Sequence, residues 1–367
     1  MPRYEARRDR LRKTMKKSGA QALLVTSFTN VTYLTGFTGD DSYLLLWSDG
    51  QIVLSDPRYT TQLEEQCPGL ELEIRPPGTN MLASIARTVG AAKITHLGFE
   101  ADSMTVGLRD RIAAEVPQVE LVATSGLVEQ LREVKDAEEI AQLREAIWYA
   151  EKAFAVLRAS LTPEKTEKQI AAELEHQMRL FGARGYSFPS IVAAGARAAL
   201  PHATPTDQAI GQCDLLLVDW GADGGLYKSD LTRVLVTGRI SPKLERVYRV
   251  VLSAQERAIA AIRPGAVSQD VDAAARGVIE STGFGRYFGH GLGHGLGLDV
   301  HELPRLSARN TVVLKPGMVV TVEPGIYLPG WGGIRIEDDV LVTRTGCEVL
   351  TNVPKQWDDA AGYTVNV

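Results

Sequence analysis

The chain contains the stretch Leu215-Leu216-Leu217-Val218-Asp219-Trp220-Gly221-Ala222-Asp223-Gly224-Gly225-Leu226-Tyr227-Lys228-Ser229-Asp230. It begins with an apolar run that ends in an aspartate, and continues with a Gly-rich segment that ends in a second aspartate. If the chain reverses at Gly224-Gly225, Asp219 and Asp230 lie opposite each other on one face of an antiparallel pair. Two carboxylates placed in this way repel each other unless a cation lies between them. The alternative is a turn aspartate and a solvated charge on a hairpin. The stretch therefore predicts a β-hairpin and makes both aspartates candidate metal ligands.

The same arrangement recurs near the end of the chain. Glu323 ends a second apolar run, residues 318–322, and Glu337 follows an alternating pattern that suggests a strand. A reversal centred near Gly330 sets the two glutamates opposite each other and puts Arg335 on the same side as Glu337. A surface ion pair between Arg335 and Glu337 is the alternative.

Three of the six histidines fall within twelve residues, in a segment where glycine is every second residue: His290, His294 and His301. Glycine at such density lets backbone approach closely. The segment lacks the Lys-Ser/Thr ending of a phosphate loop and is no dinucleotide fingerprint, so a metal or catalytic site is the better interpretation. His202 follows Pro201, and alone it is equally well an ordinary loop histidine.

Four carboxylates and an imidazole at the ends of apolar strands are costly to bury without partners. They are enough to hold two divalent ions, which indicates two-metal hydrolysis. A donor set of mostly oxygen with one nitrogen suits Mn²⁺, Co²⁺ or Fe²⁺, and also Zn²⁺.

The composition excludes several classes of protein. A net charge of −5 gives no electrostatic basis for binding nucleic acid or an anionic membrane. No run of about 18 apolar residues is present, so we expect no membrane span. The three cysteines are widely spaced with no Cys-x-x-Cys pair. This spacing favours a reducing cytoplasm and argues against disulfides or a thiolate zinc site.

The chain of 367 residues suits two domains, which we place at 1–128 and 129–367. Short apolar runs alternate with helical segments in the first, which predicts an α/β domain, and Ser48-Asp49-Gly50 predicts a hairpin turn. In the second, helices and strands occur in separate blocks, which predicts an α+β domain. Its expected helix boundaries are Asp136 with Glu139, Thr166 with Gln169 and a stop at Gly182, Ser241-Pro242, and Ser268 with a stop at Gly283.

These motifs resemble the metallopeptidase family of Xaa-Pro aminopeptidase (aminopeptidase P) and Xaa-Pro dipeptidase (prolidase). The resemblance covers nearly the whole chain. It is carried by Asp-x-Gly at 219–221, Ser-Asp-Leu-Thr-Arg at 229–233, Gly-His-Gly-Leu-Gly at 293–297, Val-His-Glu at 300–302, Val-Glu-Pro-Gly at 322–325, Arg-Ile-Glu-Asp at 335–338, and the N-terminal segments 30–39 and 55–59. It implies a creatinase-like α/β domain followed by a pita-bread catalytic domain with pseudo-twofold α+β halves.

The resemblance also implies a role for each residue. Asp219 chelates one ion, Asp230 and Glu337 bridge both, and His294 and Glu323 complete the other ion's shell. His202 and His301 match histidines that hold the scissile carbonyl, and Glu323 the proton shuttle. His290 and Arg335 match residues that line the substrate site. Manganese is the first choice of metal, with cobalt, zinc or iron as alternatives, and the implied assembly is a homodimer.

The expected activity is hydrolysis of the Xaa-Pro bond at the N-terminus of proline-containing peptides, as in aminopeptidase P. A prolidase, which must recognise the proline carboxylate, is the alternative within the enzyme class. Arg305, Arg309 or Arg335 could hold that carboxylate. A non-catalytic peptide-binding module on the same scaffold is the alternative outside it, although no ligand position is substituted here.

Overall fold

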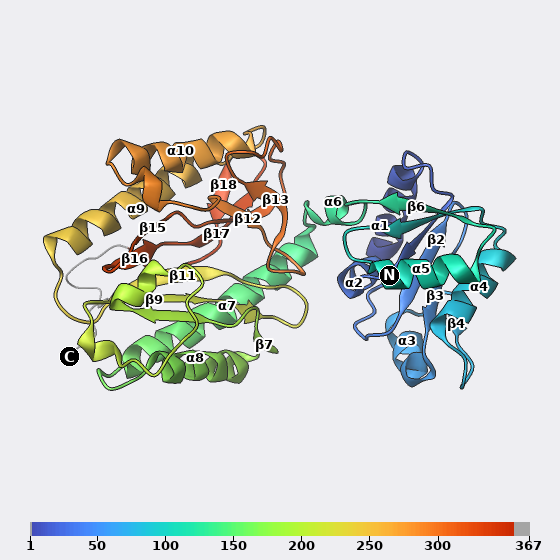
Figure 1. The fold of residues 1–367 in the computed structure, drawn as a ribbon, viewed down its shortest axis with the longest axis horizontal. Helices are drawn as coiled ribbons and strands as arrows, with labels where there is room; N and C mark the ends of the chain where they lie inside the picture. Colours follow the sequence, from blue (N-terminus) through green and yellow to red (C-terminus); the bar gives the residue numbers. More distant parts are fainter. Residues whose placement is uncertain (1, 356–367) are drawn as a thin grey trace. The chain divides into compact units, whose positions relative to one another are not determined.

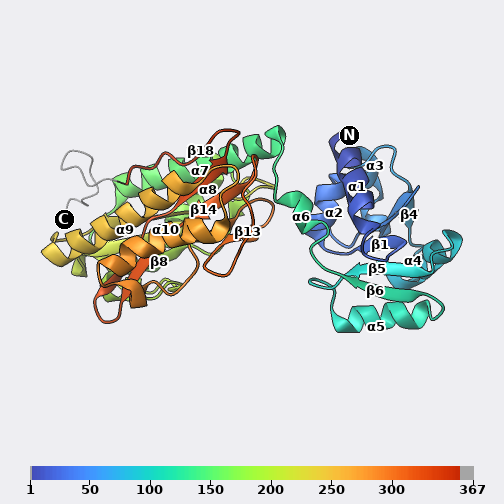
Figure 2. The ribbon, with the colours of Figure 1, turned by 90° about the horizontal axis from the view of Figure 1, so that it is seen from above.

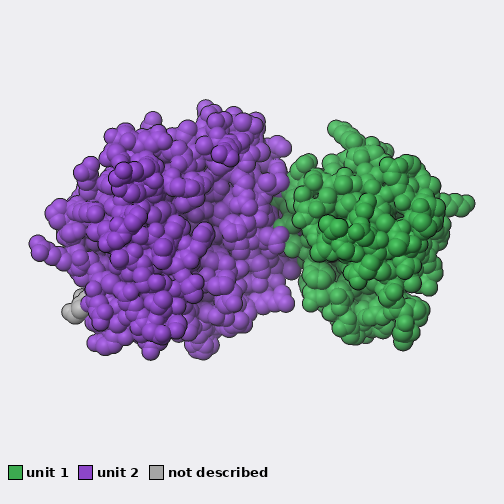
Figure 3. Space-filling model, viewed as in Figure 1, with its two compact units in different colours: residues 1–132 green, residues 133–367 purple. Residues whose placement is uncertain are grey.

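The computed structural model describes residues 2–355, and contacts within the chain divide it after Arg132 into two compact units (Figure 3). The domain boundary that we place between residues 128 and 129 stays a prediction. Within residues 2–355, no helix combines the length and the apolar character needed to cross a membrane.

The first unit is built on one six-stranded mixed sheet. Its strands are β1 Ala22–Val25, β2 Tyr43–Trp47, β3 Gln51–Ser55, β4 Leu72–Ile74, β5 His96–Glu100 and β6 Glu120–Thr124. Its helices are α1 Pro2–Met15, α2 Phe28–Thr35, η1 Pro57–Tyr59, α3 Thr60–Gln66, α4 Met81–Ala91, α5 Val106–Glu115 and α6 Glu129–Arg132. The strand order is β4-β3-β2-β1-β5-β6. The α/β prediction and the hairpin between β2 and β3 are confirmed.

Two pairs of helices frame the second unit: α7 Ala137–Ser160 with α8 Glu167–Phe181, and α9 Pro242–Ala261 with α10 Ser268–Ser281. Asp136 and Glu139 form the predicted capping box of α7, and Thr166 with Gln169 forms that of α8. The prediction that Ser268 caps α10 is wrong. Ser268 is the first helical residue, and its hydroxyl donates to the Asn310 carbonyl at 2.6 Å, so it is not available to the helix N-terminus.

The strands of this unit lie between the two helix pairs (Figures 1 and 2). They are β7 Gly185–Tyr186, β8 Ile191–Ala194, β9 Leu215–Trp220, β10 Ala222–Asp223, β11 Leu231–Val236, β12 Gly293–Gly295, β13 Glu302–Leu306, β14 Val319–Val322, β15 Gly325–Leu328, β16 Gly332–Arg335, β17 Asp338–Val342 and β18 Cys347–Val349, with short 3₁₀ turns η2 Gly195–Ala199, η3 Ile210–Gln212 and η4 Gly285–Tyr287. The larger sheets have the orders β11-β9-β8 and β13-β12-β14-β17-β18. The α+β prediction is confirmed.

Strand β9 is apolar at consecutive positions because both of its faces are buried. Leu215 and Leu217 belong to the core cluster that includes residues of α9 and α10, whereas Leu216 and Val218 belong to the cluster that includes residues of α7 and α8. A strand covered on both faces needs apolar side chains at every position. By alternation Asp219 shares the face of Leu215 and Leu217, so its carboxylate ends a buried row.

Candidate metal centre and active-site cavity

Asp219 and Asp230 come from neighbouring antiparallel strands. Thr232 pairs with Asp219 in the ladder of β9 and β11, so the turn is centred between Gly225 and Leu226, one residue further along than predicted. Asp230 therefore lies diagonally across from Asp219, not directly opposite. Moving a turn centre by one residue moves the pairing by two, which keeps both carboxylates on the same face.

Glu323 and Glu337 lie at matching positions, as the predicted reversal requires. The two glutamates lie between the ladder of β14 with β17 and the ladder of β15 with β16. The pairing register is the same in both ladders, so Glu323 is aligned with Glu337. The flanking pairs are Val322 with Asp338 and Gly325 with Arg335. The Glu337 N–H also donates to the Thr232 carbonyl at 3.2 Å. This bond brings the glutamates to the strand that follows Asp230.

His294 reaches the same place because its neighbours are glycines. A Cβ at Gly293 would lie 2.0 Å from the Thr321 carbonyl oxygen, and one at Gly295 would lie 2.1 Å from that of Leu303. Only glycine permits so close an approach of β12 to the strands beside it. The Gly-rich segment is thus a packing device that sets an imidazole beside the carboxylates.

A cavity of about 610 Å³ opens where these segments meet. The cavity is lined by the nine residues to which the family resemblance gave a role: His202, Asp219, Asp230, His290, His294, His301, Glu323, Arg335 and Glu337. Ligand atoms of Asp230, His294 and Glu337 lie within 4.8 Å of one another. His294 Nε2 lies 3.2 Å from Glu323 Oε1 and 3.6 Å from Asp230 Oδ2.

Burial and mutual repulsion dominate the electrostatics of the four carboxylates. Burial raises the pKa of Asp230 far above its usual value, and the charges of Glu337, Asp219 and Glu323 raise it further. The pKa of Glu337 is raised strongly by burial and by the charges of Glu323 and Asp219. Burial also raises the pKa of Asp219, although Arg335 opposes the shift.

Glu323 is the exception. Burial would raise its pKa, but the hydrogen bond and charge of His294, with the charges of His290 and Arg335, lower it to about 2. Its Oε1 also accepts from the Thr321 hydroxyl at 3.2 Å. Glu323 is therefore the carboxylate of the group that the surrounding residues keep ionised.

The donor set fits divalent metal ions. Oδ1 of Asp219 is buried and has no hydrogen-bond partner within residues 2–355, so a lone pair is left for a cation. His294 Nδ1 lies 3.1 Å from the Gly295 carbonyl oxygen, which holds a hydrogen on Nδ1 and directs Nε2 at the carboxylates. Four carboxylates and one imidazole nitrogen form a set that suits borderline and hard cations.

Arg335 lines the cavity and makes hydrogen bonds to three neighbouring side chains. It donates to Asp219 Oδ2 at 2.5 Å, to the Tyr327 hydroxyl at 2.8 Å and to the Thr232 hydroxyl at 3.1 Å. The alternative of a surface ion pair with Glu337 is wrong, because Arg335 is buried and its ion-pair partner is Asp219. Each of its three guanidinium nitrogens thus donates to a protein oxygen.

The histidines differ in their surroundings. His290 Nδ1 lies 2.7 Å from the Gly291 carbonyl and Nε2 lies 2.9 Å from the Tyr327 hydroxyl, and burial lowers the pKa of His290. The ring of His301 packs edge-on to that of His294 with centroids 4.4 Å apart. Loss of water around the ring and the neighbouring His294 lower the pKa of His301 to about 4.

Sequence reasoning missed Tyr327 and Thr232. Tyr327 lines the cavity and joins His290 to Arg335 through its hydroxyl, whose pKa is raised to about 12 by burial. Thr232 donates to Glu337 Oε2 at 2.6 Å. Side-chain alternation could have identified Tyr327, because residues four positions apart in an extended chain lie on the same face, which places Tyr327 on the side of Glu323.

Family models match both units. Residues 7–134 match the creatinase/prolidase N-terminal domain, and residues 141–344 match metallopeptidase family M24. An uncharacterized peptidase of Bacillus subtilis, YqhT, is 42% identical over 348 residues, which are 95% of this chain and 98% of that protein.

Two solved structures share the fold over nearly the whole chain. An Xaa-Pro dipeptidase from Bacillus anthracis is 38% identical with a TM-score of 0.93 and covers 96% of this chain and 99% of its own. An X-Pro aminopeptidase from Thermotoga maritima is 37% identical with a TM-score of 0.86, and the match covers 94% of this chain and 99% of that protein. The predicted creatinase-like domain and pita-bread catalytic domain are confirmed. The chain belongs to metallopeptidase family M24, as its motifs predicted, and is an enzyme of that family.

Proposed function

We propose that this chain hydrolyses the bond between an N-terminal residue and a following proline, as an aminopeptidase P-like exopeptidase with two divalent metal ions. The observation that carries the proposal is that four carboxylates and an imidazole from separate segments line one cavity. Similar proteins named Xaa-Pro dipeptidase and X-Pro aminopeptidase support the substrate class.

Five residues would hold the ions: Asp219, Asp230, His294, Glu323 and Glu337. Manganese is our first choice, with cobalt, zinc or iron as alternatives. Divalent cations supply Lewis acidity, which makes water a nucleophile near neutral pH and polarises a carbonyl group. The family supports a metal requirement.

The residues around the cavity would handle the substrate and the proton. The amide before proline has no N–H, so recognition rests on the carbonyl oxygen and on a space for the ring, which Phe188, Pro201 and Val300 would line. His202 and His301 would donate to the carbonyl oxygen as charge develops on it. Glu323, ionised at neutral pH, would take a proton from water and return it to the leaving proline nitrogen.

A dipeptidase is the second candidate, and Arg305 favours it. Arg335 is hydrogen-bonded to Asp219, and Arg309 is not among the cavity-lining residues. Arg305 lines the cavity and is paired with His294 in the ladder of β12 and β13. A guanidinium there could bind the free carboxylate of an Xaa-Pro dipeptide.

We also propose that the enzyme is a cytoplasmic homodimer acting on proline-containing peptides. The resemblance supports the dimer, and the three cysteines, none of them in a disulfide within the described residues, support a reducing compartment.

A peptide-length series tests the function. Metal-loaded enzyme is expected to release the first residue from Xaa-Pro-Yaa tripeptides at least about tenfold faster than from Xaa-Pro dipeptides, and to leave Xaa-Ala-Yaa peptides uncleaved. Mass spectrometry identifies the products. Chelation should abolish every cleavage. Full activity of the chelated protein would refute the metal mechanism, and a strong preference for dipeptides would select the dipeptidase.

Arg305→Met tests the carboxylate-binding role. The kcat/KM for Xaa-Pro dipeptides is expected to fall about 10- to 100-fold, because the variant loses a charge-assisted hydrogen bond to the substrate carboxylate. Tripeptide cleavage should stay within about threefold. Arg309→Met is the matched control and should change neither rate. Equal losses of kcat/KM on dipeptides and tripeptides would show that Arg305 does not bind the substrate carboxylate.

A further inference from the structure

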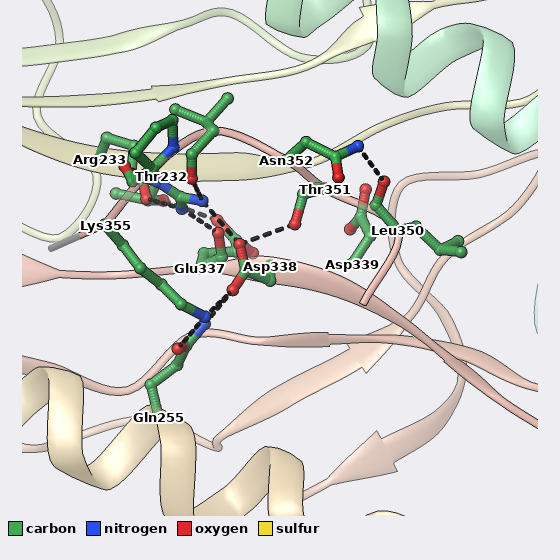
Figure 4. Close-up of polar contacts among 12 residues, drawn as sticks. Thr232, Arg233, Gln255, Glu337, Asp338, Asp339, Leu350, Thr351, Asn352 and Lys355 are labelled. Carbon is green, nitrogen blue, oxygen red and sulfur yellow. Dashed lines mark hydrogen bonds and ion pairs between the residues drawn. The ribbon is translucent and has the colours of Figure 1, made fainter. Parts of the chain in front are cut away.

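Residues Thr351–Lys355, here called the C-terminal strap, follow β18 and contact the strand that begins just after Glu337 (Figure 4). Asp338 is the first residue of that strand, β17, and by alternation it faces away from the side of Glu337. It is 1% exposed, so its charge needs partners within the protein.

Asp338 receives four side-chain donors. Its Oδ1 accepts from Arg233 Nη2 and from the Thr351 hydroxyl, both at 2.7 Å. Its Oδ2 accepts from Gln255 Nε2 at 2.7 Å and from Lys355 Nζ. Two of the four donors, Thr351 and Lys355, belong to the strap. The carboxylate is therefore a junction between β17, β11, α9 and the strap.

Arg233 connects the same junction to Glu337. Its Nη1 donates to the Glu337 carbonyl at 2.5 Å, and its Nη2 donates to the Val353 carbonyl at 2.6 Å. The preceding residue, Thr232, holds the Glu337 carboxylate through its hydroxyl at 2.6 Å. Consecutive residues of β11 thus fix the backbone and the side chain of Glu337.

The strap is also anchored to helix α9. Lys355 Nζ donates to Gln255 Oε1 at 2.7 Å, and the Lys355 carbonyl accepts from the Tyr248 hydroxyl at 2.6 Å. Lys355 is therefore held at both its ends, and its ammonium group touches both α9 and Asp338.

We propose that the strap is a clamp for the metal site, in which Lys355, Asp338 and Arg233 are positioning residues that hold the backbone of Glu337. The proposal rests on the assignment of Glu337 as a metal ligand. Groups behind metal ligands typically change metal affinity 10- to 100-fold when removed. The Lys355 ammonium group donates to Gln255 and Asp338, neither of which lines the cavity, so its effect on the site has to pass through Asp338.

The test is calorimetric titration of metal-free full-length protein with Mn²⁺. Lys355→Met is expected to weaken Mn²⁺ binding about tenfold or more, and Lys355→Arg should restore most of it. Lys168→Met is the matched control, since it removes an exposed lysine that pairs with Asp207 at 2.8 Å, and neither of these residues lines the cavity. Glu337→Gln, measured in parallel, tests the ligand assignment itself.

The outcomes separate the two hypotheses. If Glu337→Gln loses Mn²⁺ affinity and Lys355→Met binds as tightly as the unmodified protein, the clamp is refuted and the ligand assignment stands. If Glu337→Gln binds normally, the ligand assignment fails first. Thermal unfolding of the metal-free variants adds a further readout: a lower unfolding temperature in Lys355→Met with unchanged Mn²⁺ affinity would mean a purely structural strap.

Discussion

Asp230→Asn is expected to lower kcat/KM for an Xaa-Pro tripeptide by at least about a thousandfold, about 4 kcal/mol of transition-state stabilisation. Asparagine keeps the shape of the side chain but removes a negative charge that lies 3.6 Å from the His294 nitrogen and near Glu337. A neutral amide is a poor ligand for two cations, and its NH₂ group would point a donor at them. Steady-state kinetics on metal-saturated protein measures the effect.

The same variant should be more stable than the unmodified protein when both are metal-free. The charges of Glu337, Asp219 and Glu323 all disfavour ionisation of Asp230, so removing its charge relieves repulsion in a buried site. A higher unfolding temperature together with lost turnover excludes misfolding as the cause. Asp223→Asn is the control: this aspartate of β10 pairs with Lys228 at 2.6 Å and does not line the cavity. Near-normal turnover of Asp230→Asn would remove Asp230 from the metal site.

The sequence was sufficient for the helix starts of α7 and α8, each of which has a reciprocal capping pair. Capping pairs such as Asp136 with Glu139 mark a helix start through hydrogen bonds within one turn, and the structure has them. The register of Glu323 and Glu337 was also predictable, because a single reversal joins them. The turn after Asp219 was misplaced by one residue, since the glycines at 221, 224 and 225 allow more than one turn centre.

What sequence reasoning could not supply is the set of contacts between distant segments. The ion pair between Arg335 and Asp219 was not predictable, because nothing in the sequence around Arg335 indicates a partner more than a hundred positions earlier. The hydrogen bonds of Arg233 and Asp338 to Val353 and Lys355 were not predictable for the same reason, because these partners lie more than ten positions away in the sequence. Local pattern identifies which residues carry chemistry, and the tertiary fold decides which of them act on one another.

Metal loading is expected to raise the unfolding temperature strongly, and by more as the pH rises. At a free Mn²⁺ concentration about a thousand times Kd, binding to the folded state alone contributes about 4 kcal/mol. For a unit of this size that corresponds to roughly 8 to 16 °C. Scanning calorimetry of metal-free and Mn²⁺-loaded protein from pH 5 to 8 measures the increment at each pH.

The sign of the pH dependence follows from the buried carboxylates. In metal-free protein, Asp230 and Glu337 have folded-state pKa values well above their usual ones, so the folded state binds more protons than the unfolded state at pH values above about 4. Stability of the metal-free protein therefore falls as the pH rises through that window. Glu323 acts in the opposite sense, but its contribution is lost only as the pH falls toward about 2, below the range tested.

Bound cations remove this penalty, because the carboxylates must be ionised to act as ligands. The loaded protein should keep its stability as the pH rises, so the gap between the two forms widens and Mn²⁺ binding releases protons. Calorimetric titrations in two buffers of different ionisation enthalpy would count those protons. In a variant carrying both Asp230→Asn and Glu337→Gln, Mn²⁺ should raise the unfolding temperature only slightly and with little pH dependence. An increment in the unmodified protein that is equally flat from pH 5 to 8 would mean that these carboxylates do not bind the metal.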